Sequence, residues 1–172
     1  MALSRFSVLT RRRFLGALGG GGLLVAGSAG WLVALRGCAP AVRGLACLSD
    51  HEYRTLAALA VALFPEGGAF AAGAGSRDLA RTFDAFLADE DEDRQSDLKR
   101  ALLLLEYGPV LYEHRGVTFS HLSAEDRLAH FEGWATSGEL LRRQVALAFR
   151  KFLSLVFYDD ETVMAQVGYE IL

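Results

Sequence analysis

The sequence predicts an all-α fold, an irregular bundle of about five to six helices behind an N-terminal leader helix. After Leu48, apolar residues recur at intervals of three and four, the spacing of one helix face. Helix-capping residues precede several of these segments. No run of alternating polar and apolar residues and no hairpin turn signal occurs among them, so we expect no sheet.

Serine residues mark the starts of the first two predicted helices. Ser49, with Glu52 three residues later, forms a capping box for a helix that ends in the Pro-Glu-Gly-Gly run at 65–68. Ser76 is the predicted cap of a second helix after a short flexible loop. The expected inner faces consist of Tyr53, Leu56, Ala60, Leu63 and Phe64 in the first helix, and of Leu79, Phe83, Phe86 and Leu87 in the second.

The third helix follows the acidic run at 89–93. That run lacks the glycine and the terminal glutamate of a calcium loop, so a solvated turn is expected. Gly108 and Pro109 predict a break or kink, and the segment closes at 114–116. Glu106 and Glu113 are interpreted as parts of a solvated face. The inner face of this helix consists of Leu98, Ala101, Leu102 and Leu105.

Three helices are predicted in the C-terminal third. Ser123 caps one that runs to Trp134, and Ser137 or Gly138 starts the next. After Phe152 that helix is apolar on every side, which predicts a buried central helix. Its expected stripe consists of Leu141, Val145, Ala148, Phe152 and Val156. The Asp-Asp pair at 159–160 forms a turn before a short last helix over 161–167.

Charge is distributed unevenly along the 172 residues. Residues 1–48 hold six of the 18 Lys and Arg residues and none of the 21 Asp and Glu residues, which leaves a net charge of −9 on the remainder. An acidic domain of this kind argues against a nucleic-acid partner, which requires basic patches.

Few residues suggest catalysis or metal binding. Both cysteines, Cys38 and Cys47, precede the helical region, so that region contains no thiolate site. Cys47 is either a thiol that pairs with another chain or a free, inert one. The histidines show no metal-ligand spacing. A site formed by His114, His121 and His130 converging in space stays open as a hypothesis, which would make this a small exported enzyme. We expect no catalytic residue and no cofactor in this chain.

The N-terminal segment has the pattern of a twin-arginine export leader. Arg11 and Arg12, followed by Phe14 and Leu15, stand before an uncharged, weakly apolar stretch at 16–35. The alternative is a plain membrane anchor, since the stretch is about long enough to span a bilayer. We therefore expect two domains, a signal peptide or anchor over 1–41 and a helical domain over 42–172.

The sequence leaves three possibilities for the leader, which are cleavage, lipidation and retention. Ala39 and Ala41 are small residues at the two positions that a leader peptidase reads, which predicts cleavage after Ala41. Cys38 stands in a lipoprotein-like context and is a lipidation candidate. A leader that is not cut tethers the protein to the membrane.

The order of several weak motifs resembles a known family. Leu48 to Glu52, followed by an apolar helix and the Phe64-Pro65 stop, looks like the opening of the gluconate 2-dehydrogenase subunit 3 family. The C-terminal half is also similar in order and spacing. Its matching positions are Phe119, Ser120, His121, Leu122, Ser123, Arg127, Trp134, Arg142, Arg143, Lys151 and 158–169.

The resemblance implies a function without catalysis in this chain. Members of the family are small subunits of membrane-associated dehydrogenases. It implies a large FAD-dependent partner of the glucose-methanol-choline (GMC) type, exported by the twin-arginine translocase on this leader. Electrons would pass from the flavin to a c-type cytochrome subunit or another acceptor. The expected location is the periplasm, at the inner membrane. Candidate partner-binding residues are Trp134, Arg142, Arg143, Tyr158 and Tyr169. The alternative is a membrane-tethered binding or scaffold protein of the cell envelope that acts alone.

Overall fold

The computed structural model describes residues 40–67 and 73–168. The chain divides into two compact units, 1–39 and 40–172, and every described residue belongs to the second. The predicted export motif at Arg11, Arg12, Phe14 and Leu15, together with Cys38 and Tyr169, therefore lies outside the described residues. None of the helices in the described ranges is long and apolar enough to cross a bilayer.

Helices account for all the regular structure of the described ranges, which confirms the all-α prediction. These ranges contain six α-helices, one 3₁₀-helix and no strand. In chain order they are α3 (Asp50–Leu63), α4 (Leu79–Ala88), α5 (Glu92–Glu113), η1 (Phe119–His121), α6 (Ala124–Ala135), α7 (Leu140–Tyr158) and α8 (Glu161–Val167).

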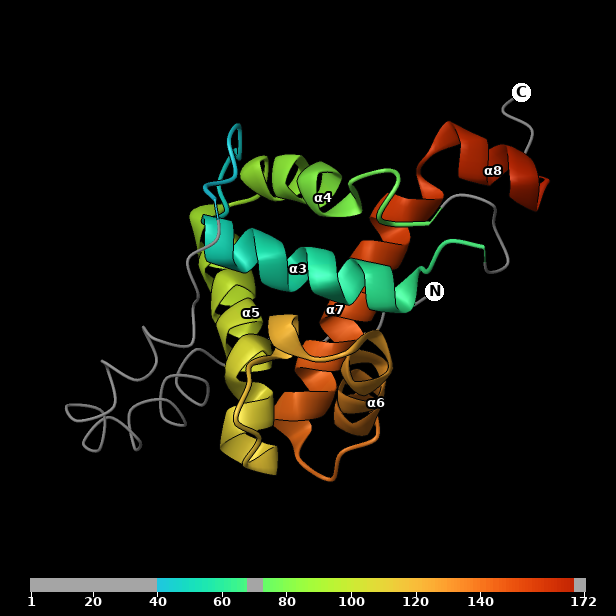
Figure 1. Ribbon diagram of the computed structural model, residues 1–172. Coiled ribbons are helices and arrows are strands. Elements are labelled where there is room, and N and C mark those ends of the chain that lie inside the picture. The colour runs from blue at the N-terminus through green and yellow to red at the C-terminus, as the bar shows by residue number, and fades with distance from the viewer. Residues whose placement is uncertain (1–39, 68–72, 169–172) are drawn as a thin grey trace, which may run out of the picture. The chain divides into compact units, whose positions relative to one another are not determined.

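Helix α3 lies at the centre of the bundle. It packs against α4, α5, η1 and α6, while α7 packs against α4, α6 and α8. Figure 1 shows α3 running across α5 and α7, with α4 above it and α6 below it. The core between these helices is aromatic, and its largest fully buried side chains include Phe83, Phe119, Phe131, Trp134 and Phe149.

Capping explains where most helices begin. The Ser49–Glu52 capping box is present at α3, and Ser123 caps α6, as the sequence predicts. The prediction for Ser76 is wrong, because Asp78 is the N-cap of α4 and its side chain accepts from the Arg81 N–H. The acidic run is also more than a solvated turn. Asp91 caps α5, and the two acids that follow favour the positive end of the helix dipole.

The predicted break at Gly108-Pro109 does not occur, since α5 continues to Glu113. A residue before proline normally avoids helical geometry because its Cβ meets the proline ring, and Gly108 has no Cβ. Gly108 also allows a close helix contact. A Cβ there would lie 2.5 Å from Cζ2 of Trp134 and 2.8 Å from Nε2 of His130.

The inner face of α7 differs from the predicted stripe. The helix begins after Glu139, later than the predicted start at Ser137 or Gly138. Leu141, Ala148 and Phe152 are only partly buried. The prediction that the helix is buried on all sides after Phe152 is wrong. The residues that are buried are Val145, Ala146, Phe149, Leu153, Val156 and Phe157.

Residues 40–48, which we call the strap, are held on the helices by side chains that bond to their backbone. Asp84 is 1% exposed and accepts from the N–H groups of Ala46, Cys47 and Leu48 at 2.5, 3.0 and 2.7 Å. Arg81 donates to the carbonyls of 43 and 44 at 3.1 and 2.9 Å. The strap is therefore part of the folded domain, although it contains no helix.

Candidate functional site

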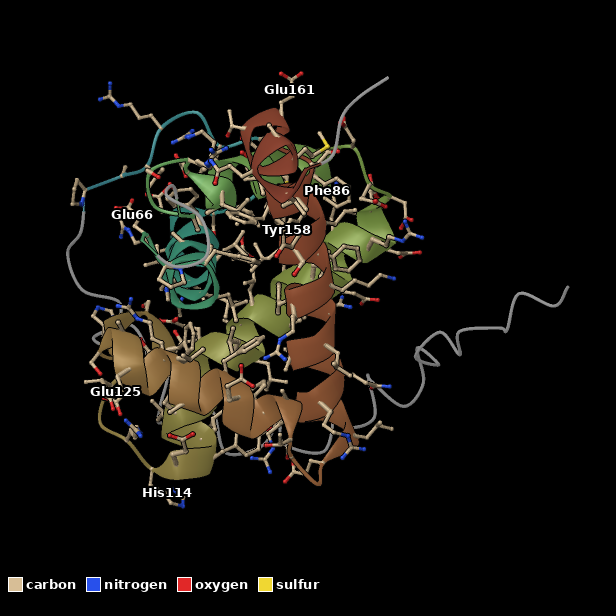
Figure 2. All side chains as sticks on the ribbon, turned by 90° about the vertical axis from the view of Figure 1, so that its right-hand side faces the viewer. Glu66, Phe86, His114, Glu125, Tyr158 and Glu161 are labelled. Atoms are coloured by element: carbon tan, nitrogen blue, oxygen red, sulfur yellow. The ribbon has the colours of Figure 1, made fainter. Side chains whose placement is uncertain are left out.

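The outer side of α7 carries large apolar residues that are about half exposed. Leu140, Leu147, Leu155 and Tyr158 are 60, 56, 55 and 45% exposed. They recur at intervals of seven, eight and three residues, which places them on one helix face. We call these four residues the α7 face. Figure 2 looks onto this side of the molecule and labels Tyr158 near the upper end of α7.

The α7 face leads into a groove between α4 and the C-terminal end of α7. The groove has a volume of about 340 Å³, and Phe86 of α4 and Leu155 of α7 both line it. The remaining lining residues are Arg77, Leu79, Thr82, Val156, Phe157, Asp159 and Asp160.

Charged residues close one end of the groove. Arg77 forms an ion pair with Asp160 and a hydrogen bond with Thr162. Asp160 also caps α8 by accepting from the N–H groups of Thr162 and Val163. Hydrogen bonds from the Thr162 hydroxyl and from Arg77 lower the pKa of Asp160 to about 2. The carboxylate is therefore charged at neutral pH and fastens α8 beside the groove.

The predicted partner-binding residues do not form one surface. The prediction is wrong for Trp134, which is 1% exposed and packs in the core. Arg142 pairs with Glu139 at 2.9 Å and lies over the Tyr112 ring, 4.8 Å from its centroid. Arg143 donates to the Ser137 carbonyl at 2.5 Å. Tyr158 alone of the four described residues belongs to the α7 face.

Cys47 is a half-buried free thiol beside Asp84. Its Sγ lies 3.8 Å from the Asp84 carbonyl oxygen. Burial, reinforced by the negative charge of Asp84, raises the pKa of the Cys47 thiol. Because the thiolate is the reactive species, this environment favours the inert thiol over the alternative of pairing with another chain.

Glu106 contradicts its interpretation as part of a solvated face. The residue is fully buried, and its two carboxylate oxygens accept from groups on two other elements. The Thr55 hydroxyl of α3 donates to it at 2.9 Å. At η1, the Ser120 N–H and hydroxyl donate at 3.0 and 2.7 Å. Glu106 therefore joins α3, α5 and η1 from inside the bundle.

His130 and Glu113 form a second polar contact, between α6 and the end of α5. His130 is 3% exposed, and its Nδ1 lies 2.5 Å from Oε1 of Glu113. Burial lowers the pKa of His130, and the carboxylate of Glu113 opposes that shift. Glu113 also pairs with Arg115 at 2.8 Å. The pair therefore links the end of α5 to α6, with His130 inside and Glu113 exposed.

The three histidines of the open hypothesis have separate surroundings. His114 is the exposed C-cap of α5, and Figure 2 labels it at the opposite end of the molecule from Tyr158. His121 is exposed, with Nδ1 3.0 Å from the Thr118 hydroxyl. Within residues 40–67 and 73–168, no three His, Cys, Asp or Glu side chains are placed to hold a metal ion.

The arrangement at α7 combines exposed apolar residues with an adjoining groove. Exposed apolar residues with a charged residue, Lys151, between Leu147 and Leu155, and a groove beside them, are features of protein-binding surfaces. Sequence reasoning missed Leu140, Leu147 and Leu155 as surface residues. The signal that could have found them is their recurrence at intervals of seven and eight residues, beside the predicted stripe.

Comparisons with known proteins return no relative of this chain: no family model, no curated protein and no solved structure matches it.

Proposed function

We propose that this chain is a non-catalytic small subunit that binds a folded FAD-dependent dehydrogenase of the GMC type. It exports that enzyme through the twin-arginine translocase. In this proposal the flavin and the catalysis belong to the large partner, and a c-type cytochrome subunit or another acceptor receives the electrons. The assembled complex lies in the periplasm at the inner membrane.

The observation that carries the proposal is the α7 face. Large exposed apolar residues on one helix face, with polar residues such as Lys151 among them, are a feature of interaction surfaces. Its neighbouring groove gives an apolar side chain of a partner a place to insert, as occurs at the energetic centres of interfaces. The assignment of a flavoprotein as the partner comes from the family resemblance of the sequence.

The leader supports the same proposal from the other end of the chain. A twin-arginine leader serves proteins that are exported after folding, which suits cargo that folds around a cofactor. The arginine pair at Arg11 and Arg12 would then direct both subunits, since a bound partner needs no leader of its own.

The binding half of the proposal is tested by placing charge on the α7 face. We expect Leu147→Glu/Leu155→Glu to weaken binding of the co-expressed flavoprotein at least about tenfold, because a carboxylate would be buried against apolar surface. Leu103→Glu is the matched control, as Leu103 is 46% exposed on α5. Binding by the α7-face variant and by the control is measured by co-purification and by a titration that follows flavin absorbance. Equal binding by the two variants would contradict the proposal.

The export half is tested with Arg11→Lys/Arg12→Lys in cells that also produce the flavoprotein. We expect the flavoprotein to stay in the cytoplasm with its FAD bound, which cell fractionation and activity measurements detect. Full flavoprotein activity in the periplasm of these cells would contradict the export role. A stable, monodisperse domain that captures no flavoprotein would instead favour the membrane-tethered scaffold that acts alone.

A further inference from the structure

We propose that the folded domain protects the Ala41–Val42 peptide bond from leader peptidase, so that the leader stays attached as a membrane tether. This inference rests on the proposed export of a folded chain. It selects the third of the outcomes that the sequence leaves open for the leader.

The two residues that flank Ala41 are bonded to the first turns of α3. Arg54 donates through Nη2 to the carbonyl of Pro40. The N–H of Val42 donates to Oδ2 of Asp50 at 3.1 Å. The residues on either side of Ala41 are thus held through their backbone on the same helix.

The rest of the strap, residues 43–48, holds residues 40–42 against the helices. Immediately after Val42, Arg81 bonds two consecutive carbonyls, and the buried Asp84 bonds three consecutive N–H groups. Leu48, at the end of the strap, is 5% exposed and belongs to the core. Release of the strap therefore breaks several charge-assisted hydrogen bonds at once.

A protease needs these same backbone groups. An extended peptide that binds in a cleft forms main-chain hydrogen bonds with the protein that holds it. The Ala41 side chain is exposed, so the obstacle is the occupied backbone on either side rather than burial of the small residue. Cleavage then requires local opening, and its rate follows the population of the open state.

The export route decides whether this protection operates. A chain that crosses the membrane unfolded would present Ala41–Val42 to the peptidase before the strap docks. A chain that crosses already folded arrives with the strap on α3. The order of folding and translocation therefore determines whether the leader is kept.

The test uses the full chain with its leader, purified in detergent and incubated with purified leader peptidase, so that it does not depend on export. We expect the wild-type chain to stay intact over a time in which Asp50→Ala/Arg54→Ala is cut after Ala41. Hydrogen bonds to charged groups shift such an equilibrium by about tenfold or more, and we expect at least that increase in rate. Intact-mass measurement gives the new N-terminus.

The control is Asp97→Ala/Arg100→Ala, which removes a similarly charged pair, 3.2 Å apart, from α5. It should be cut no faster than the wild type. Circular dichroism confirms that each variant is folded, and Arg54→Ala alone replaces the double variant if that one unfolds. Equal cutting of the wild type and the strap variant would overturn the proposal. So would a chain isolated from cells that begins at Val42 or at a lipid-modified Cys38. The location of the flavoprotein, measured separately, reports on the proposed function.

Discussion

The Glu106 cluster and the α7 face reverse the usual relation between polarity and burial. Glu106, with Thr55 and Ser120, is polar yet lies inside the bundle. Leu147 and Leu155 are apolar yet lie on its surface. The first region satisfies its hydrogen bonds within the domain, whereas the side chains of the second are about half exposed. The contrast separates the contacts that hold the domain together from the surface that we propose a partner binds.

The two regions therefore predict different responses to mutation. Changes at the cluster and in the core should lower the free energy of unfolding. Changes on the α7 face should leave that free energy nearly unchanged and affect binding instead.

The largest loss of stability is expected for Leu153→Ala. Leu153 is fully buried on the inner side of α7, two residues from Leu155. Removing its side chain creates a cavity, which typically costs about 2–5 kcal/mol. Urea unfolding followed by circular dichroism measures the change. A loss below about 1 kcal/mol would show that the core tolerates a cavity behind the α7 face.

Glu106→Ala should cost about 1–3 kcal/mol, because it removes the acceptor of the Ser120 N–H and leaves the Thr55 hydroxyl with only the His51 carbonyl. Glu106→Gln keeps one acceptor oxygen and should cost less. The same urea measurement ranks the two variants. If both are as stable as the wild type, Glu106 does not join the three elements as its contacts indicate.

Acid should weaken the strap through Asp84. Burial alone would raise the pKa of Asp84, but three strap N–H donors outweigh burial and lower it below 3.8. A carboxyl group with a lowered folded pKa stabilises the fold above its unfolded value, and that contribution is lost as the pH falls through the folded pKa. We expect the urea concentration at the midpoint of unfolding to decrease as the pH is lowered below about 4. The fall should be smaller in Asp84→Asn, and an identical pH profile in both proteins would rule out this cause.

The smallest effect on stability is expected for Leu155→Ala. Its side chain is 55% exposed, so the substitution should change the free energy of unfolding by less than about 0.5 kcal/mol. It should still weaken flavoprotein binding in a titration, since it removes apolar contact area. A loss of stability close to that of Leu153→Ala would mean that Leu155 belongs to the core, which would remove the contrast between the two sides of α7.

Local signals were sufficient to predict most of the fold. The helix starts at Ser49 and Ser123 depend on side chains within three residues of the cap, so the sequence contains the whole interaction. The failures at Ser76 and Pro109 have tertiary causes. Asp78 caps α4 while also accepting from the Tyr53 hydroxyl of α3 at 2.6 Å. Gly108 is packed against α6, which favours continuation of the helix through Pro109.

The candidate site was less accessible to prediction. Tyr158 was identified and lies on the α7 face, whereas Trp134 was assigned to a surface and lies in the core. The sequence of an apolar helix end is the same whether neighbouring helices bury it or leave it exposed. Only the placement of α4 and α8 beside α7 leaves Leu155 and Tyr158 outside.

The sequence by itself determined that this domain is helical, where most helices begin, and that an arginine pair precedes a weakly apolar segment. These properties depend on short-range spacing and capping. Only the tertiary structure decided that Glu106 is inside, that the α7 face is outside and that the strap lies on α3 and α4. Each of those outcomes joins residues far apart in the chain, as Asp84 and the strap are, and packing of whole helices brings them together.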